Sequence, residues 1–166
     1  MKALLVIDMQ NVCVGENHAE FFHYDNHKLL NSVNAAIADN ENNLVVYIRN
    51  IMKKSLLNKF APFQAYEGTS EVELVEGLNL VSDYVFDKYT GDAFSNKELL
   101  GFLKERAVDE IEVVGVDGGG CVALTALGAV KNGFRVTVNT KAVGTMFDKN
   151  EEKYYKKLKE QGARFI

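Results

Sequence analysis

Short apolar runs typical of buried strands alternate along this chain with longer segments of helical periodicity. The first run, Lys2–Ile7, is apolar beyond its lysine, as expected for a strand buried on both faces of a sheet. The next segment, Asn26–Asp39, places its apolar residues on one helical stripe. Because crossover connections put helices on both faces of a parallel sheet, this order predicts an α/β fold: a three-layer, doubly wound, Rossmann-like parallel sheet.

The same two patterns predict further strands and helices. The other strands are expected at residues 44–48, 81–88, 110–116 and 134–139, with a short last one at residues 164–166. The other helices are expected after a capping box that begins at Ser95, at residues 121–132 and at residues 148–161, where Asp148 and Glu151 have capping-box spacing and Gly162 fits the C-terminal end. No repeat, low-complexity stretch or linker interrupts this order, so residues 1–166 are expected to form one domain.

Composition narrows the class of partner. The 166 residues are 47% hydrophobic with a net charge of −4, and their basic residues are scattered, which argues against nucleic acid and anionic membranes. The longest apolar run, residues 122–130, is too short to span a bilayer, and the first residues lack a signal-peptide pattern. Two cysteines in such a chain indicate free thiols in a reducing compartment. We therefore expect a cytoplasmic protein that binds a small molecule.

Three chemically useful side chains follow strand-like runs. Asp8, Lys88 and Cys121 each stand where an expected strand ends. In open α/β sheets ligands bind beyond these carboxyl ends, so we expect the three to share one site. Cys121 also opens an expected helix, where free N–H groups and the helix dipole are expected to lower its pKa. A base, a cation and a thiol together indicate nucleophilic acyl transfer.

Each of these residues has an ordinary structural explanation when taken alone. Cys121 would be a buried thiol, Asp8 a loop-capping carboxylate and Lys88 a solvated lysine. The glycines at residues 118–120 favour the functional interpretation, because they permit unusual backbone angles, close approach of a ligand and N–H groups that face an oxyanion. Such a run can also bind phosphate, but the chain lacks both the P-loop and the G-x-G-x-x-G pattern, so a nucleotide site is disfavoured.

Three motifs, in order along nearly the whole chain, are similar to those of a known family. They are residues 4–11; Lys88 with Phe94, Leu99 and Leu100; and residues 114–116 with Cys121, Val122, Thr125, Ala126 and residues 133–136. In these motifs the chain resembles the isochorismatase-like cysteine hydrolases, the superfamily that includes nicotinamidases and N-carbamoylsarcosine amidase.

The resemblance implies a catalytic triad of Asp8, Lys88 and Cys121. It also implies an oxyanion hole made by the backbone N–H groups of Asp117 and Cys121, and a non-proline cis peptide between Val116 and Asp117. The expected reaction is hydrolysis of a small amide, or a related C–N acyl substrate, through a thioester acyl-enzyme. The expected assembly is a homo-oligomer, a dimer or a tetramer.

The chain departs from nicotinamidases where those enzymes hold a metal. They carry an Asp-x-His pair and a further histidine after the second strand, whereas residues 49–54 here contain no histidine. His18, His23 and His27 all lie earlier, and we expect them to be polar loop and helix residues instead of ligands. No metal or other cofactor is therefore expected. Because Cys121 is present, the vinyl-ether hydrolysis of the isochorismatases proper, which lack this cysteine, is disfavoured.

The substrate pocket is less defined by the sequence. Gln10 in the first motif and the aromatic residues Phe60, Tyr89 and Phe94 are candidate substrate-binding residues, although the aromatic ones fit ordinary core packing equally well. Two other interpretations remain open. One is a non-catalytic relative that binds a small ligand. The other is a redox role through Cys13 and Cys121, which requires Cα atoms within about 7 Å; otherwise Cys13 is expected to be a packing residue.

Overall fold

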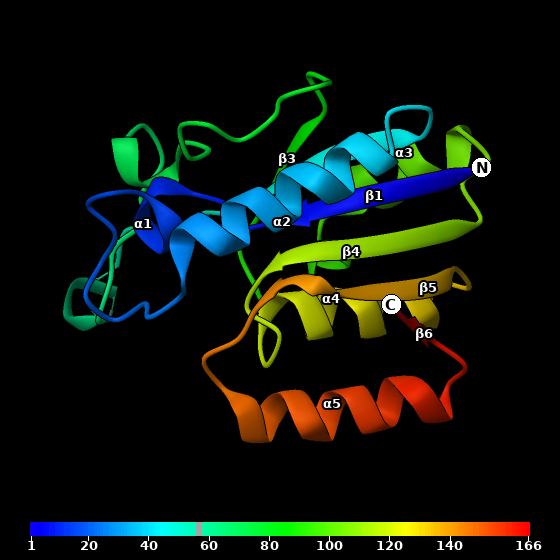
Figure 1. Ribbon diagram of the computed structural model, residues 1–166. Helices are drawn as coiled ribbons and strands as arrows, with labels where there is room; N and C mark the ends of the chain where they lie inside the picture. Colours follow the sequence, from blue (N-terminus) through cyan, green and yellow to red (C-terminus); the bar gives the residue numbers. More distant parts are fainter. Residues whose placement is uncertain (56–57) are drawn as a thin grey trace.

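The computed structural model describes residues 1–55 and 58–166, and its centre is a six-stranded parallel sheet (Figure 1). The strands are β1 (Lys2–Ile7), β2 (Leu44–Asn50), β3 (Val85–Lys88), β4 (Glu110–Val116), β5 (Arg135–Gly144) and β6 (Arg164–Phe165). Their order across the sheet is β3-β2-β1-β4-β5-β6, and each neighbouring pair is parallel. The chain therefore builds toward one edge from β1 and toward the other from β4. The point where the direction switches lies between β1 and β4, which is where open α/β sheets bind ligands.

Helices cover both faces of the sheet, as the sequence predicts. Alternate residues of β1 point to opposite faces: Leu4 and Val6 pack with α2 (Asn26–Asp39), whereas Leu5 and Ile7 pack on the other side. That second face is covered by α3 (Lys97–Glu105), α4 (Cys121–Lys131) and α5 (Asp148–Glu160). The three-layer, doubly wound fold is confirmed. In the described part of the chain, no helix combines the length and apolar character needed to cross a bilayer.

The irregular segments and the outer strands differ in detail from the sequence predictions. The strands Lys2–Ile7 and Glu110–Val116 and the helix Asn26–Asp39 are confirmed at both ends. The third strand begins at Val85 and not at Val81, because side-chain groups bind the backbone before it: the Val81 N–H donates to the Tyr47 hydroxyl. Strand β5 continues to Gly144, past a register shift opposite residues 113–115 of β4. The segment after β1 contains a short helix, α1 (Asn11–Val14).

The capping box expected at Ser95 is wrong by one residue. Asn96 is the N-cap of α3, and its Oδ1 accepts hydrogen bonds from the N–H groups of Glu98 at 2.9 Å and Leu99 at 3.4 Å. Ser95 ends the preceding turn, and its hydroxyl donates to the Asp92 carbonyl at 2.7 Å. A turn immediately before the helix thus shifts the cap from the first to the second of two suitable residues.

The cap expected at Asp148 is also wrong. Asp148 is the first residue of α5, and Phe147 occupies the N-cap without a side-chain bond. Glu151 accepts a hydrogen bond from the Thr145 hydroxyl at 2.7 Å instead of returning to a capping residue. Gly162 follows the helix with a φ of 84°, so the expected left-handed C-terminal glycine is confirmed.

A buried carboxylate ties the amino-terminal half of β4 to its neighbours. Glu112 is 2% exposed, and its carboxylate contacts Lys2 Nζ at 2.5 Å, Asn139 Nδ2 at 2.9 Å and Asn40 Nδ2 at 3.2 Å. Each of these donors would lose one acceptor if the carboxylate were removed, although Asn40 Nδ2 would keep the Ala36 carbonyl at 2.9 Å.

Glu112→Ala is expected to lower the free energy of unfolding by about 3 kcal/mol, because it breaks a partly buried ion pair and removes one hydrogen bond from each of two amides. Urea unfolding followed by circular dichroism measures the loss. The matched control is Asp109→Ala, whose carboxylate pairs with Arg135 at the exposed surface and should matter less. An equal loss in the two variants would contradict this role for Glu112.

Candidate active site

Asp8, Lys88 and Cys121 meet at the carboxyl ends of the strands. The Lys88 ammonium lies 2.9 Å from Asp8 Oδ2 and 3.2 Å from Cys121 Sγ. Its third neighbour is Asn50 Oδ1 at 3.1 Å, so the three acceptors match the three N–H bonds of an ammonium. The sequence therefore identified three residues that the structure brings together and missed Asn50. Asn50 could have been found from the sequence, because it also stands at the end of a strand, β2.

The strand order explains how these side chains reach one another. Asp8 directly follows β1, and Asn50 and Lys88 are paired last residues of β2 and β3. Lys88 must reach across β2, and neighbouring strands are about 4.8 Å apart, so its long stem is needed. Asp8 has a φ of 52°, a left-handed conformation that aspartate and asparagine tolerate better than most residues. Its N–H still donates to the Ile48 carbonyl at 2.9 Å, which anchors the bend to β2.

The turn before Cys121 presents two backbone N–H groups without an acceptor in the described part of the chain; they belong to Asp117 and Cys121. In contrast, the N–H groups of residues 118–120 donate to Asp117 or Gly144 at 2.8 to 3.0 Å. The peptide bond between Val116 and Asp117 is cis, as the resemblance implies. One free N–H belongs to Cys121 itself and the other to the residue four positions before it, and the two could bind one oxygen atom.

Packing explains two of the three glycines that precede Cys121. A Cβ atom on Gly118 would overlap the Thr145 hydroxyl oxygen, and one on Gly119 would overlap the Phe147 carbonyl oxygen. Close approach of the segment before α5 therefore requires glycine at both positions, which corrects the expectation that a ligand approaches them. An added Cβ on Gly120 would meet only ordinary contacts.

The electrostatics of the site contradict the expected acidic thiol. Burial and the negative charge of Asp8 raise the pKa of Cys121 to about 12, and the opposing effect of Lys88 does not outweigh them. Burial by itself lowers the pKa of Lys88, but Asp8 and Cys121 reverse this, and the net pKa is raised. The resting site therefore holds a neutral thiol beside an ammonium. Asp8 Oδ1 is a buried acceptor with no hydrogen-bond partner in the described residues.

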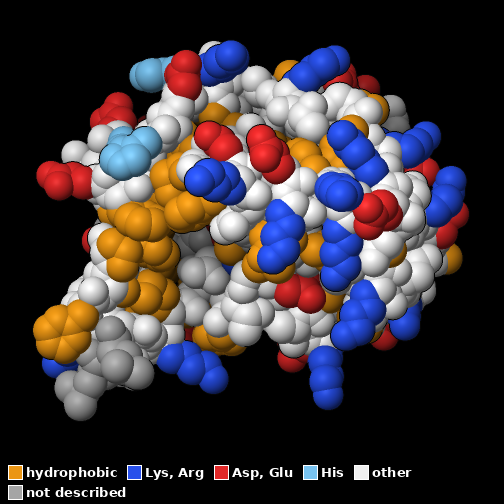
Figure 2. All heavy atoms as spheres, turned by 90° about the horizontal axis from the view of Figure 1, so that it is seen from below, with side chains coloured by type: hydrophobic (Ala, Val, Ile, Leu, Met, Phe, Trp, Pro, Cys, Tyr) orange, Lys and Arg blue, Asp and Glu red, His pale blue; other side chains and the backbone are white. Residues whose placement is uncertain are grey.

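A cavity of about 270 Å³ opens beside Cys121. Its lining comes from the strand ends, the start of α4, the segment after β1, the segment after β2 and the residue before α5. The residues are Asp8, Gln10, Val12, Cys13, Phe21, Phe22, Tyr24, Asn50, Phe63, Val116, Asp117, Gly120, Cys121 and Phe147. Figure 2 shows hydrophobic side chains gathered around a hollow at its left, the side of the carboxyl ends of the strands in Figure 1.

Five of these residues form a continuous aromatic wall: Phe21, Phe22, Tyr24, Phe63 and Phe147. The Phe21 ring centroid lies 5.2 Å from Phe22, 5.7 Å from Phe63 and 6.2 Å from Phe147, and Phe22 lies 6.0 Å from Tyr24. Most of the wall comes from the irregular segment after β1. The aromatic residues of that segment were not singled out from the sequence.

The aromatic residues expected to bind substrate lie outside this cavity. Phe60 is 89% exposed, and Tyr89 is 56% exposed with Lys53 Nζ 5.2 Å from its ring centre. Phe94 is buried on the other face of the sheet, 5.6 Å from the Phe134 ring. Phe94 is therefore a core residue, which is the alternative that the sequence left open.

Gln10, the remaining candidate, does line the cavity, but its amide is fully used within the protein. Its Nε2 donates to the carbonyls of Asn50 at 3.2 Å and Val72 at 2.9 Å, and its Oε1 accepts from the Asn50 N–H at 2.8 Å. These bonds fix the backbone of Asn50, whose side chain binds Lys88. Gln10 therefore positions the site from behind and offers no free polar atom to a ligand.

Cys13 lies in α1 and lines the same cavity as Cys121. Both are free thiols. Burial, followed by the charge of Asp8, raises the pKa of Cys13 well above its usual value. Cys13 is packed in the core with Met9 and Val12, in agreement with a packing role.

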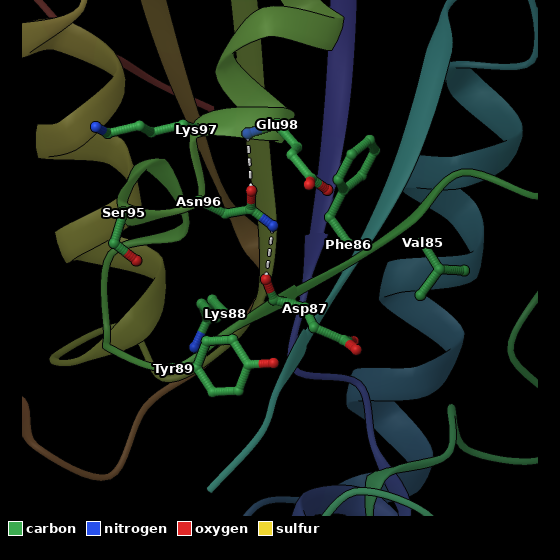
Figure 3. A pocket seen from close by; sticks show the side chains of 9 residues that line it. All are labelled: Val85, Phe86, Asp87, Lys88, Tyr89, Ser95, Asn96, Lys97 and Glu98. Atoms are coloured by element: carbon green, nitrogen blue, oxygen red, sulfur yellow. Dashed lines mark hydrogen bonds between the residues drawn. The ribbon is translucent and has the colours of Figure 1, made fainter. Parts of the chain in front are cut away.

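A larger hollow runs along the edge strand β3, shown in Figure 3. It is lined by residues 85–89 and 95–98 and has a volume of about 600 Å³. Two of its polar side chains are already paired: Asn96 Nδ2 donates to the Asp87 carbonyl at 2.8 Å, and the Asp87 carboxylate accepts from Arg49. The Lys88 ammonium binds Asp8, Asn50 and Cys121. Asp8, Asn50 and Cys121 instead line the smaller, aromatic cavity.

The three histidines do not come together. His18 and His27 line one surface hollow, and His23 lines another beside Tyr24 and Asp25. Throughout residues 1–55 and 58–166, no three His, Cys, Asp or Glu residues are grouped closely enough to hold a metal ion.

The segment that carries the metal ligands in nicotinamidases holds different groups here. Asn50 Oδ1 accepts from Lys88, and Met52 forms a backbone bridge with Tyr66. The Asn50 amide is already bound to an ammonium, and Met52 offers only a thioether. Neither replaces the carboxylate and imidazole ligands of a zinc site. The described residues at this position therefore do not fit the metal that the resemblance would bring.

Comparison with known proteins places the chain among hydrolases of one fold. The family model of the isochorismatase domain matches residues 2–166. No curated protein matches the chain closely enough to be counted as a relative.

Three solved structures superpose on nearly the whole chain. The pyrazinamidase of Pyrococcus horikoshii in complex with zinc is 24% identical, with a TM-score of 0.85 over 99% of this chain and 98% of its own. The N-carbamoylsarcosine amidase of Thermoplasma acidophilum is 23% identical, with a TM-score of 0.83 over 99% and 94%. The nicotinamidase of Bacillus subtilis is 24% identical, with a TM-score of 0.83 over 98% and 97%. These likenesses show the fold.

Proposed function

The chain belongs to the isochorismatase family, and we propose that it hydrolyses the C–N bond of a small amide through a thioester on Cys121. The observation that carries the proposal is that a carboxylate and a thiol, those of Asp8 and Cys121, both lie within 3.2 Å of the Lys88 ammonium. The amidases among the similar structures support an amide substrate. Asp8, Lys88 and Cys121 are the proposed catalytic residues.

In the proposed reaction, Asp8 takes the Cys121 proton as the sulfur attacks the substrate carbonyl. With a thiol pKa of about 12, only a small fraction is thiolate at neutral pH, so a base must act during attack. The free Oδ1 of Asp8 is an acceptor for that proton. Lys88 keeps its charge and stabilises the developing thiolate.

The tetrahedral intermediate places negative charge on the former carbonyl oxygen. We assign its stabilisation to the backbone N–H groups of Asp117 and Cys121, which have no acceptor in the described residues. Protonated Asp8 then gives its proton to the leaving amine, and the C–N bond breaks. A water molecule that loses a proton to Asp8 attacks the thioester, releasing the carboxylic acid and restoring the thiol.

A second candidate function is binding of a small ligand without catalysis. One observation favours it: the pKa of Cys121 is raised, whereas a typical nucleophilic cysteine has a lowered one. The two functions differ in turnover, because a binding protein would not release amine from any amide.

The test is a panel of small primary amides, with released ammonia as the readout and mass spectrometry of the quenched protein for an acyl adduct. Turnover and an adduct on Cys121 are expected for at least one amide. Cys121→Ala should show neither, whereas Cys13→Ala should still form the adduct, because its thiol is not the proposed nucleophile. Ammonia release that persists in Cys121→Ala would refute the scheme, and adduct-free binding would favour the second candidate.

We also propose that the chain assembles as a homodimer or homotetramer, as the resemblance implies. Exposed apolar side chains along and before the edge strand β3 support this: Leu80, Val81, Tyr84 and Val85 are each more than a third exposed. Light scattering on the eluted protein would contradict it by giving the 18.5 kDa mass of a single chain.

A further inference from the structure

We propose that the cavity beside Cys121 selects uncharged amides whose acyl group is a hydrocarbon, and rejects amides that carry a second, ionised group. This substrate class rests on the proposed function. It is argued from the charges, the unpaired polar atoms and the apolar surface of the described residues that line the cavity.

The charges of the lining exclude an anionic substrate. None of the described lining residues is a lysine, an arginine or a histidine, whereas Asp8 and Asp117 contribute carboxylates. The nearest cation, Lys88, is already bound to three acceptors. A carboxylate on the substrate would lose its hydration, find no positive partner and face two negative groups.

The Asp117 carboxylate does not provide a site for a cation either. Its Oδ1 accepts from the Gly119 N–H at 2.8 Å, and its Oδ2 accepts from the Tyr24 hydroxyl at 3.0 Å and the Met146 N–H at 2.6 Å. These donors satisfy the carboxylate within the protein. The Tyr24 hydroxyl is turned to Asp117, so this residue offers its ring to the cavity. A cationic substrate would have to displace these bonds.

Among the described residues, several polar atoms of the lining without a hydrogen-bond partner lie at the reactive end. They are Asp8 Oδ1, the backbone N–H groups of Asp117 and Cys121, and the Asn50 amide nitrogen, whose oxygen is held by Lys88. One acceptor and a few donors match a single carboxamide, whose NH₂ donates and whose carbonyl oxygen accepts. One carboxamide of the substrate would therefore occupy the free hydrogen-bonding groups of the cavity.

The rest of the cavity is hydrocarbon. The aromatic wall, together with Val12 and Val116, faces the acyl group, and the volume of about 270 Å³ limits that group to roughly the size of one ring. Apolar surface of this kind stabilises a bound hydrocarbon by removing it from water and offers no partner to an ionised group. The proposed substrates therefore carry a carboxamide at one end and an uncharged hydrocarbon group at the other.

Four amides with the same six-membered aromatic ring and carboxamide test the proposal: benzamide, nicotinamide, 3-carbamoylbenzoate and 1-methyl-3-carbamoylpyridinium. The expected kcat/KM for benzamide exceeds those of the anionic and the cationic analogue by about tenfold or more, mostly through KM. It should also exceed that of acetamide, which leaves the aromatic wall uncovered. A charged analogue turned over as well as benzamide would overturn the proposal, as would acetamide equal to benzamide.

A change of charge in the wall sharpens the test. Phe147 is 43% exposed, so Phe147→Arg places a cation at the rim without burying it fully. This variant should shift the ratio of kcat/KM for 3-carbamoylbenzoate over benzamide upward by about tenfold or more. Ile166→Arg is the matched control, because Ile166 is 53% exposed and lies outside the cavity lining. An equal shift in both variants would show that the cavity does not set the preference.

Binding to the Cys121→Ala variant separates the two possible failures. If no amide is hydrolysed, but benzamide binds this variant in calorimetry more tightly than both charged analogues, the proposed reaction fails and the selectivity stands. If amides are hydrolysed while a charged analogue is preferred in both turnover and binding, the reaction stands and the selectivity fails. Absence of binding by benzamide in the variant and of turnover in the wild type overturns both.

Discussion

Asp8→Asn is expected to reduce turnover by about a thousandfold and, at the same time, to make Cys121 react faster with iodoacetamide at neutral pH. Turnover falls because asparagine cannot accept the thiol proton. Alkylation becomes faster because the charge of Asp8 is the second largest cause of the raised pKa of Cys121, and only burial contributes more. Removing that charge lowers the pKa toward neutrality, so the thiolate fraction at pH 7 increases.

The size of the second effect follows from thiol chemistry. Each unit by which the pKa falls gives about ten times more thiolate. A less basic thiolate is also a weaker nucleophile, so the alkylation rate should rise only about threefold per unit. Asparagine also tolerates the φ of 52° at this position, which makes the variant compatible with the bend after β1.

Alkylation rates between pH 6 and 10, followed by mass spectrometry of the Cys121 peptide, measure this prediction. The control is Asp117→Asn, which removes a second carboxylate of the cavity that is not among the main causes of the pKa shift of Cys121. Its alkylation profile should match that of the wild type. Slower alkylation in Asp8→Asn than in the wild type would contradict the assigned electrostatics.

Lys88→Met is expected to have the opposite effect on the thiol and the same effect on turnover. The ammonium is the group that lowers the pKa of Cys121, so its loss should raise that pKa further and slow alkylation at every pH below it. Turnover should fall by about a thousandfold, since the developing thiolate loses its cation. The same alkylation series measures the shift.

The variant also leaves the Asp8 carboxylate, 6% exposed, without its ion-pair partner. A loss of stability of about 3 kcal/mol is therefore expected, and circular dichroism must show that the protein is folded. The double variant Asp8→Asn with Lys88→Met removes both charges and should regain stability without regaining turnover. An unchanged alkylation profile in folded Lys88→Met would exclude the proposed role of the ammonium.

The fold and the meeting of Asp8, Lys88 and Cys121 could be predicted because both depend on local patterns with topological consequences. Continuous apolar runs mark strands buried on both faces, and residues after such runs gather at one edge of a parallel sheet. Asp8, Lys88 and Cys121 were identified in this way, although they are up to 113 positions apart in the sequence. The rule needs no knowledge of packing.

Features that depend on tertiary contacts were not predictable in the same way. Ser95 and Asn96 are both good N-caps, and only the preceding turn decides between them. Phe22 and Phe94 look alike in sequence, yet one lines the cavity and the other packs under α3 and α4. The pKa of Cys121 was misjudged because a helix N-terminus lowers it and burial raises it, and the sequence does not reveal how deeply a residue is buried.

The position of Lys88 has a dynamic consequence. It lies on β3, at the edge of the sheet, which is held by four residue pairs to β2 alone. Short strands with one neighbour open more readily than central ones, by local fluctuations that leave the rest of a domain intact. Fraying of this single strand would withdraw the ammonium from the thiol and the carboxylate while β1 and β4 stay paired. The reactive centre is thus only as persistent as the least supported strand that contributes to it.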